Sequence, residues 1–187
     1  MTSMLQPSIP TQVDNSVFYK ILISRNVPVN IINVGGNIKQ TLEKILSSQM
    51  SGKCVVEGYI KKNTINIVSY SSGSVDGENV HFHVMFECEV CMPVEGMKIN
   101  CTIKNITKAG IRAEVGVNDS PLVIFIARDH HEITDYFNSV KIGDNIQIRV
   151  IGQRFELNDT FISIIAELLE PQKKIVIKKK RKLVVKS

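Results

Sequence analysis

Cysteine and histidine are the residues of this chain whose spacing could support metal chemistry. Cys88 and Cys91 form a C-x-x-C pair, and His81 and His83 precede them in the same stretch. Zinc takes four nitrogen or sulfur ligands, which makes these residues a candidate zinc site. However, residues 80–90 alternate apolar and polar side chains, as a strand does. Because the alternation places Cys88 on the apolar face and both histidines on the other, we predict a structural cysteine and no metal.

A second group of titratable side chains is the stretch Asp-His-His-Glu at residues 129–132. It falls between two predicted strands, where mixed charges are typical of a solvated loop. No serine or cysteine occupies the sharp, glycine-flanked turn that presents a nucleophile. The glycine pair at 35–36 lacks the spacing of a phosphate-binding loop. We therefore predict a non-enzymatic protein without a cofactor.

The net charge of +5 is distributed unevenly along the chain. Residues 172–187 contain eight Lys or Arg and no acid, which leaves 15 basic and 18 acidic side chains before them. Residues 93–170 hold eight basic and eleven acidic side chains. Affinity for nucleic acid rises with the number of phosphates that a protein neutralises. We therefore expect any RNA binding by residues 93–170 to be weak or confined to one face.

The elements that would position such a face lie in residues 93–170. Apolar and polar side chains alternate at 98–104, 111–115, 146–150 and 162–168. Alternation is typical of strands buried on one side, whereas the continuous apolar run at 122–127 predicts a strand covered on both sides. The longest connection, 128–143, has room for a short helical turn. Five short strands without a long helix predict an oligonucleotide-binding (OB) barrel.

An α+β domain is predicted upstream, at residues 16–92. Apolar side chains at helical spacing between Ile38 and Met50 predict its helix. Asn37 is the expected N-cap, with Gln40 as its capping-box partner. The predicted strands are residues 16–25, 53–60, 63–70 and 80–90, and the predicted loops are residues 26–36 and 71–79. The domain therefore has the order strand, helix and three strands.

Several short segments occur in a characteristic order. In the barrel they are Pro93-Val94-Glu95-Gly96, Lys108-Ala109-Gly110-Ile111, Phe125-Ile126-Ala127-Arg128, Val150-Ile151-Gly152-Gln153-Arg154 and Asn158-Asp159-Thr160-Phe161. In the upstream domain they are Phe18-Tyr19, Gly52-Lys53-Cys54 and Gly58-Tyr59-Ile60. The barrel resembles the S-one RNA-binding domain. More narrowly, residues 17–170 resemble the stalk protein of multisubunit RNA polymerases, which is the seventh subunit of the eukaryotic enzyme and the E-prime subunit of the archaeal one.

The resemblance implies an accessory subunit that docks on the polymerase core and guides nascent RNA. Its upstream part would be the tip domain, with Gly58, Tyr59 and Ile60 as expected docking residues. A small fourth-subunit-like partner is expected along the junction of tip and barrel. The extra residues at both ends suggest a distant lineage such as a large DNA virus. The expected location is the nucleus, or a cytoplasmic viral factory or virion. No run approaches the ~20 apolar residues that span a bilayer, so no membrane association is expected.

RNA contacts are expected on one face of the barrel. Typical S-one domains present aromatic residues and a histidine on which bases stack, and Ile111 and Ala113 take two of these places here. Phe125 stands where the histidine would be, and it is either a stacking platform or a core residue. The predicted RNA-binding residues are Lys104, Lys108, Arg112, Phe125, Arg128, Arg149 and Arg154.

The two ends of the chain differ from both domains. Residues 1–15 are predicted to be a disordered leader. Residues 171–187 form a basic tail, and its candidate phosphate contacts are Lys178, Lys179, Lys180, Arg181 and Lys182. Three interpretations of the tail stay open: a solvated tail without a specific partner, an arm that touches nucleic-acid phosphates, and a nuclear-import signal.

Two other functions remain as alternatives. A free-standing RNA-binding protein, similar to a translation factor or acting as a decoy, would explain the barrel and the tail but gives the tip domain no purpose. A nuclease or exosome-type component would need catalytic carboxylates or a ring-forming partner. The proteins that co-purify with the chain would distinguish these alternatives from a polymerase subunit.

Overall fold

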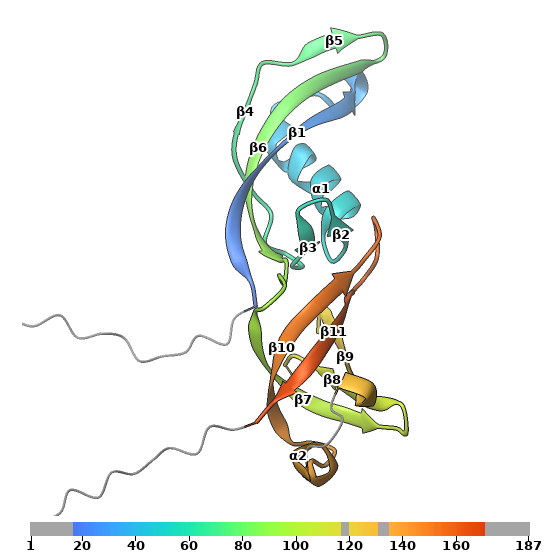
Figure 1. Ribbon diagram of the computed structural model, residues 1–187. Coiled ribbons are helices and arrows are strands. Elements are labelled where there is room, and N and C mark those ends of the chain that lie inside the picture. The colour runs from blue at the N-terminus through green and yellow to red at the C-terminus, as the bar shows by residue number, and fades with distance from the viewer. Residues whose placement is uncertain (1–16, 117–119, 131–134, 171–187) are drawn as a thin grey trace, which may run out of the picture.

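The computed structural model describes residues 17–116, 120–130 and 135–170. They form two parts (Figure 1). The tip is a sheet with one helix packed on it, and a barrel lies end to end with the tip. This architecture confirms the predicted fold class. The predicted leader and the basic residues of the tail lie outside the described residues. Among the described residues, no helix is long and apolar enough to cross a membrane.

The tip is built around two long antiparallel strands. Its elements are β1 Tyr19–Asn30, the 3-10 helix η1 Ile31–Asn33, α1 Ile38–Met50, β2 Cys54–Val55, β3 Gly58–Ile60, β4 Asn66–Tyr70, β5 Ser74–Asp76 and β6 Asn79–Cys91. β1 pairs with β6 from Tyr19 opposite Val90 to Asn30 opposite Asn79. The sheet order is β1-β6-β3-β2, and β4 and β5 also pair with β6. β6 is therefore the strand to which the rest of the tip is attached.

Helix α1 covers one face of this sheet (Figure 1). Leu42, Leu46 and Met50 recur every four residues and are buried against the sheet, as their spacing predicts. The predicted capping box does not form, because the Asn37 side chain makes no cap hydrogen bond. Instead, the Asn37 carbonyl accepts from the backbone N–H of Thr41.

The tip strands differ from the predicted ones in three places. β1 continues past residue 25 to Asn30, because β6 offers it a partner along its whole length, and an edge strand tolerates Pro28. The single strand predicted at 53–60 is a hairpin of β2 and β3. The predicted loop at 71–79 contains β5, which pairs with β6. The first difference comes from pairing with distant residues, and the other two are short hairpins formed by neighbouring residues.

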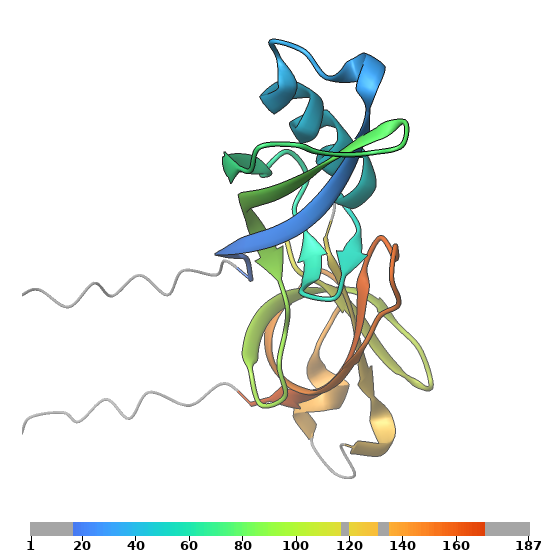
Figure 2. The same ribbon diagram turned by 90° about the horizontal axis from the view of Figure 1, so that it is seen from above.

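The barrel is closed by five strands, in the order β10-β11-β9-β8-β7. They are β7 Lys98–Ile106, β8 Gly110–Glu114, β9 Leu122–Ala127, β10 Asn145–Arg154 and β11 Ile162–Leu169. Figure 2 shows the ring that they form. The interior is filled by apolar side chains from every strand. The predicted helical turn between β9 and β10 consists of η2 Arg128–His130 and α2 Asp135–Ser139.

Backbone hydrogen bonds join the tip to the barrel. The N–H of Cys54 in β2 donates to the carbonyl of Asp159 at 2.7 Å, and the N–H of Asn158 donates to the carbonyl of Cys54 at 2.9 Å. Asn158 and Asp159 lie in the turn between β10 and β11. Cys54 and Tyr59 of the tip are buried together with the barrel core. These contacts hold β2 against the last hairpin of the barrel.

Candidate nucleic-acid interface

Phe125 points outward from the barrel. Its neighbours in β9, Ile124 and Ile126, are fully buried, whereas 49% of Phe125 is exposed. The apolar run at 122–127 is therefore covered on one side only, contrary to the prediction, because no described element lies over the outer face of β9. The interpretation of Phe125 as a core residue is excluded. An exposed aromatic ring on an OB barrel is a surface on which a base can stack.

The strands on either side of β9 give Phe125 two neighbours. Arg112 of β8 lies opposite Phe125 in the antiparallel ladder, and Ile165 of β11 lies opposite it in the parallel ladder. Ile165 is 52% exposed. A groove of about 270 Å³, which we call the barrel groove, is lined by Phe125, Arg112 and the turn between β7 and β8. A cation and an aromatic ring thus meet at one groove, and Ile165 lies opposite the aromatic residue on the neighbouring strand.

Two lysines lie on the β7 side of the barrel groove. Lys104 is exposed at a β-bulge, where the pairing of β7 with β8 shifts between Ile103 and Asn105. Lys108 is exposed in the turn that follows β7. Neither ammonium group forms an ion pair within the described residues. Both can therefore contact phosphate without first breaking such a pair.

The remaining predicted arginines are paired with carboxylates. The ion pairs are Arg112–Glu114 at 3.2 Å, Arg149–Glu167 at 3.0 Å and Arg154–Glu156 at 3.3 Å. Exposed pairs of this kind contribute little to stability, so a phosphate can compete with the carboxylate. Arg149 and Arg154 belong to β10, which β11 separates from β9. The structure therefore brings Arg112, but not these two residues, next to Phe125.

Arg128 directly follows β9 and makes contacts within the protein. Its Nε donates to the Lys108 carbonyl at 3.0 Å, and its Nη1 donates to Oδ1 of Asn138 at 3.0 Å. The guanidinium also lies over the Phe137 ring, 4.9 Å from its centroid. Arg128 thereby ties the Lys108 turn to α2. It positions one wall of the barrel groove.

The residues predicted to dock on the polymerase lie in the interior. Tyr59 is 5% exposed and Ile60 is fully buried. Gly58 has a φ of +119°, and a Cβ there would lie 2.5 Å from the Cys91 carbonyl oxygen. These three residues offer no surface to a partner, which corrects their expected role as direct contacts. Tyr59 packs with the barrel core and Ile60 packs with the tip core, so β3 joins the two cores.

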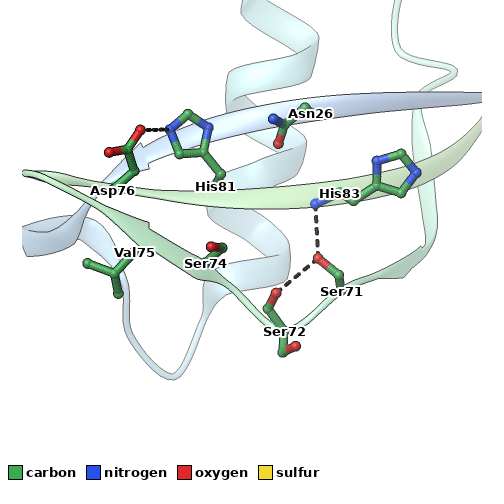
Figure 3. Close-up of a pocket in the computed structure, with 8 residues that line it drawn as sticks. All are labelled: Asn26, Ser71, Ser72, Ser74, Val75, Asp76, His81 and His83. Atoms are coloured by element: carbon green, nitrogen blue, oxygen red, sulfur yellow. Dashed lines mark hydrogen bonds and ion pairs between the residues drawn. The ribbon is translucent and has the colours of Figure 1, made fainter.

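The cysteine and histidine side chains of β6 do not converge. Cys88 is fully buried, as predicted, and burial raises the pKa of its thiol to about 11. Cys91 is also buried, which raises its pKa to about 12. His81 lies beside Asp76, and the His83 ring points away from both (Figure 3). The described residues contain no group of three or more metal-ligating side chains. Part of the stretch 129–132 lies outside the described residues.

The far end of the tip carries exposed apolar residues that the sequence analysis did not single out. They are Ile31 at 50%, Ile32 at 87%, Val34 at 37% and Val75 at 67% exposed. We call these four residues the distal patch. An open hollow of about 670 Å³, lined mostly by polar side chains, includes Val75 (Figure 3). Three of these residues lie close together in the predicted loop at 26–36. This cluster was the sequence signal for the patch, because a solvated loop rarely contains several apolar residues.

The fold and the interface define a class of protein: an OB barrel with an aromatic and basic groove, carried by an α+β tip. The chain is 25% identical over 171 residues to a predicted DNA-directed RNA polymerase subunit, L376, of Acanthamoeba polyphaga mimivirus, covering 83% of each chain. It is 24% identical over 161 residues to DNA-directed RNA polymerase II subunit RPB7 of Glycine max. It is 26% identical over 162 residues to DNA-directed RNA polymerase II subunit 7 of Arabidopsis thaliana. Both plant alignments cover 78% of this chain and 89% of the relative.

No protein-family model matches the chain. The three relatives nevertheless confirm the resemblance to the seventh-subunit stalk proteins, at low identity over most of the chain. One relative is viral and two are from plants.

Proposed function

We propose that this protein is a non-catalytic stalk subunit of a DNA-dependent RNA polymerase, which docks through its tip and contacts nascent RNA through its barrel. The observation that carries the proposal is the similarity to RNA polymerase subunits over most of the chain, including both the tip and the barrel. The proposal includes a small fourth-subunit-like partner. It places the protein in the nucleus or in a cytoplasmic viral factory.

The distal patch supports docking by the far end of the tip. A side chain as exposed as Ile32 gains free energy when a partner buries it, by about 25 cal/mol for each Å² of apolar surface. The patch lies at the opposite end of the tip from the barrel (Figure 1). A subunit attached there would leave the barrel free to project away from the enzyme. This geometry replaces the expectation that residues 58–60 make the contact.

The barrel groove supports the RNA contact. Phe125 can stack on a base, and Lys104, Lys108 and Arg112 can contact phosphates nearby. Because the barrel carries more acids than bases, these contacts are weak and sensitive to salt. Weak contacts suit a subunit that must let the transcript slide past.

Purification of the tagged full-length protein from its native source tests the proposal. We expect the large polymerase subunits to remain bound at moderate salt and to be identified by mass spectrometry. Ile32→Glu should release them, because it places a charge in the docking contact. Ile142→Glu is the matched control, since Ile142 is a 65% exposed isoleucine on the barrel. Recovery of RNA alone, lost as salt rises, would replace the polymerase assignment with a free-standing RNA-binding protein.

A further inference from the structure

A second groove lies where the tip meets the barrel. Its volume is about 380 Å³, and its lining includes Gly52, Tyr59 and Lys62 from the tip and Arg112 and Phe161 from the barrel. We call it the junction groove. Arg112 also lines the barrel groove. The two grooves therefore meet at one cationic side chain.

Phe161 gives the junction groove an exposed aromatic ring. It is 44% exposed and directly precedes Ile162, which is fully buried, so alternation turns Phe161 outward. Its carbonyl oxygen accepts from the Cys54 thiol at a donor-to-acceptor distance of 3.7 Å, which fixes this backbone against the tip. The phenylalanine thus has a defined position at the boundary of the two domains.

The register of the parallel ladder between β11 and β9 gives the separation of Phe125 from Phe161, which directly precedes β11. Ile162 lies opposite Leu122, so Phe161 and Phe125 are offset by four positions along neighbouring strands. At about 3.3 Å per residue, the offset is about 13 Å. Both rings face outward, and a strand of a few nucleotides can reach from one to the other. An OB fold covers about 4–16 nucleotides of single strand.

The tip contributes a cation to the junction groove. Gly52 has a φ of +74°, and a Cβ there would lie 3.0 Å from Cγ and Cε of Lys62. The absence of a side chain at Gly52 lets the stem of Lys62 lie across it, along the groove wall. Among the described residues, the lining also includes the carboxylate of Glu114, which is paired with Arg112. The lining therefore includes two cationic side chains, Lys62 from the tip and Arg112 from the barrel.

We propose that the junction groove binds single-stranded RNA as a continuation of the barrel groove, so that one strand runs across both domains. Phe161 and Phe125 are the two stacking platforms, and Arg112 and Lys62 contact the phosphates between and beyond them. This inference rests on the RNA contact in the proposed function and extends it to the tip. It adds Phe161 and Lys62 to the residues expected from the sequence.

Titration of labelled single-stranded RNA with the full-length protein tests the inference. Two oligonucleotides, of about 5 and about 12 nucleotides, span the site sizes of an OB fold. Phe161→Ala should weaken binding of the longer RNA by about 5- to 150-fold, because one stack is lost. The affinity advantage of the longer RNA over the shorter one should largely disappear. Phe161→Tyr keeps an aromatic face and should bind like the wild type, and Lys62→Gln should lower the salt dependence.

Three results would overturn the inference in distinguishable ways. If Phe161→Ala and Lys62→Gln bind both RNAs like the wild type while Phe125→Ala is weakened, the RNA is confined to the barrel groove and the proposed function stands. If Phe125→Ala also binds like the wild type, the RNA contact itself fails. If Phe161→Ala binds RNA normally but releases the polymerase subunits in the pull-down, the junction groove holds a protein segment. Thermal unfolding of each variant checks that the fold is retained.

Discussion

Arg112 and Phe125 lie opposite each other in the ladder of β8 and β9, on the outer surface of the barrel. The ring of Phe125 is half exposed, and the Arg112 guanidinium lies 3.2 Å from Glu114. A stacking surface therefore stands beside a cation whose present partner is a half-buried carboxylate. This pair is the centre of the RNA contact that we propose.

Replacement of Phe125 by alanine should weaken the binding of single-stranded RNA. Loss of one base–aromatic stack costs about 1–3 kcal/mol, or about 5- to 150-fold in Kd. Fluorescence anisotropy with a labelled oligonucleotide measures the change. Ile165→Ala is the control, because Ile165 is the exposed neighbour of Phe125 on β11 and has no ring to stack. Equal losses for both variants would argue against stacking.

Replacement of Lys104 or Lys108 by glutamine should reduce the salt dependence of RNA binding. Each phosphate contact with single-stranded nucleic acid contributes about 0.7 to the slope of log Kobs against log salt. We expect each variant to lose about that amount, as measured by titrations at several salt concentrations. Lys98→Gln is the control, since Lys98 lies at the other end of β7, opposite Arg149. An unchanged slope in both test variants would remove these lysines from the interface.

Replacement of Gly110 by alanine should destabilise the barrel. Gly110 has a φ of +157°, and a Cβ there would lie 2.3 Å from the carbonyl oxygen of Ile126 in the neighbouring strand. The strained backbone and the close contact should cost about 1–3 kcal/mol in the free energy of unfolding. Urea unfolding measures the loss. Gly152→Ala should change stability by no more than about 0.5 kcal/mol, because nothing lies within 4 Å of its Cβ position.

The contribution of Glu57 to stability should depend on pH. Burial opposes ionisation of its carboxyl, but hydrogen bonds from Arg25, whose Nη2 lies 2.6 Å from both oxygens, prevail and lower its pKa. A lowered pKa in the folded state means that the stabilisation is present above the unfolded pKa of about 4.3 and is lost as pH falls through the folded value. Glu57→Gln should therefore be less stable than the wild type near neutral pH, by about 1 kcal/mol because the pair is partly exposed.

Urea unfolding of the wild type and Glu57→Gln at several pH values, from neutral to acid, checks this dependence. The difference between them should shrink as the solution becomes acidic. Glu78→Gln serves as the control, because Glu78 is exposed and its side chain has no partner among the described residues. A difference for Glu57→Gln that stays constant across the pH range would contradict the assigned sign.

The sequence by itself determined most of the strands, the helix and the inward direction of Cys88. These features follow from local periodicity, since a period of two or of 3.6 already states which side chains share a face. It also carried the resemblance to the polymerase stalk protein, through the order of short segments such as Lys108–Ile111. The extension of β1 was missed because it depends on a distant partner, β6. The short hairpin of β5 with β6 was missed because residues 71–79 do not show the alternation of apolar and polar side chains that marks a strand.

Only the tertiary structure decided which faces are covered. Phe125 and Tyr59 both lie in apolar strand segments, yet one ring is exposed on the barrel and the other is buried between the domains. The local pattern of apolar residues cannot distinguish the exposed ring from the buried one, because burial depends on which distant element packs over a residue. The junction groove has the same origin. Lys62 and Phe161 are far apart in the chain, and they line one groove only because β2 is hydrogen-bonded to the last hairpin of the barrel.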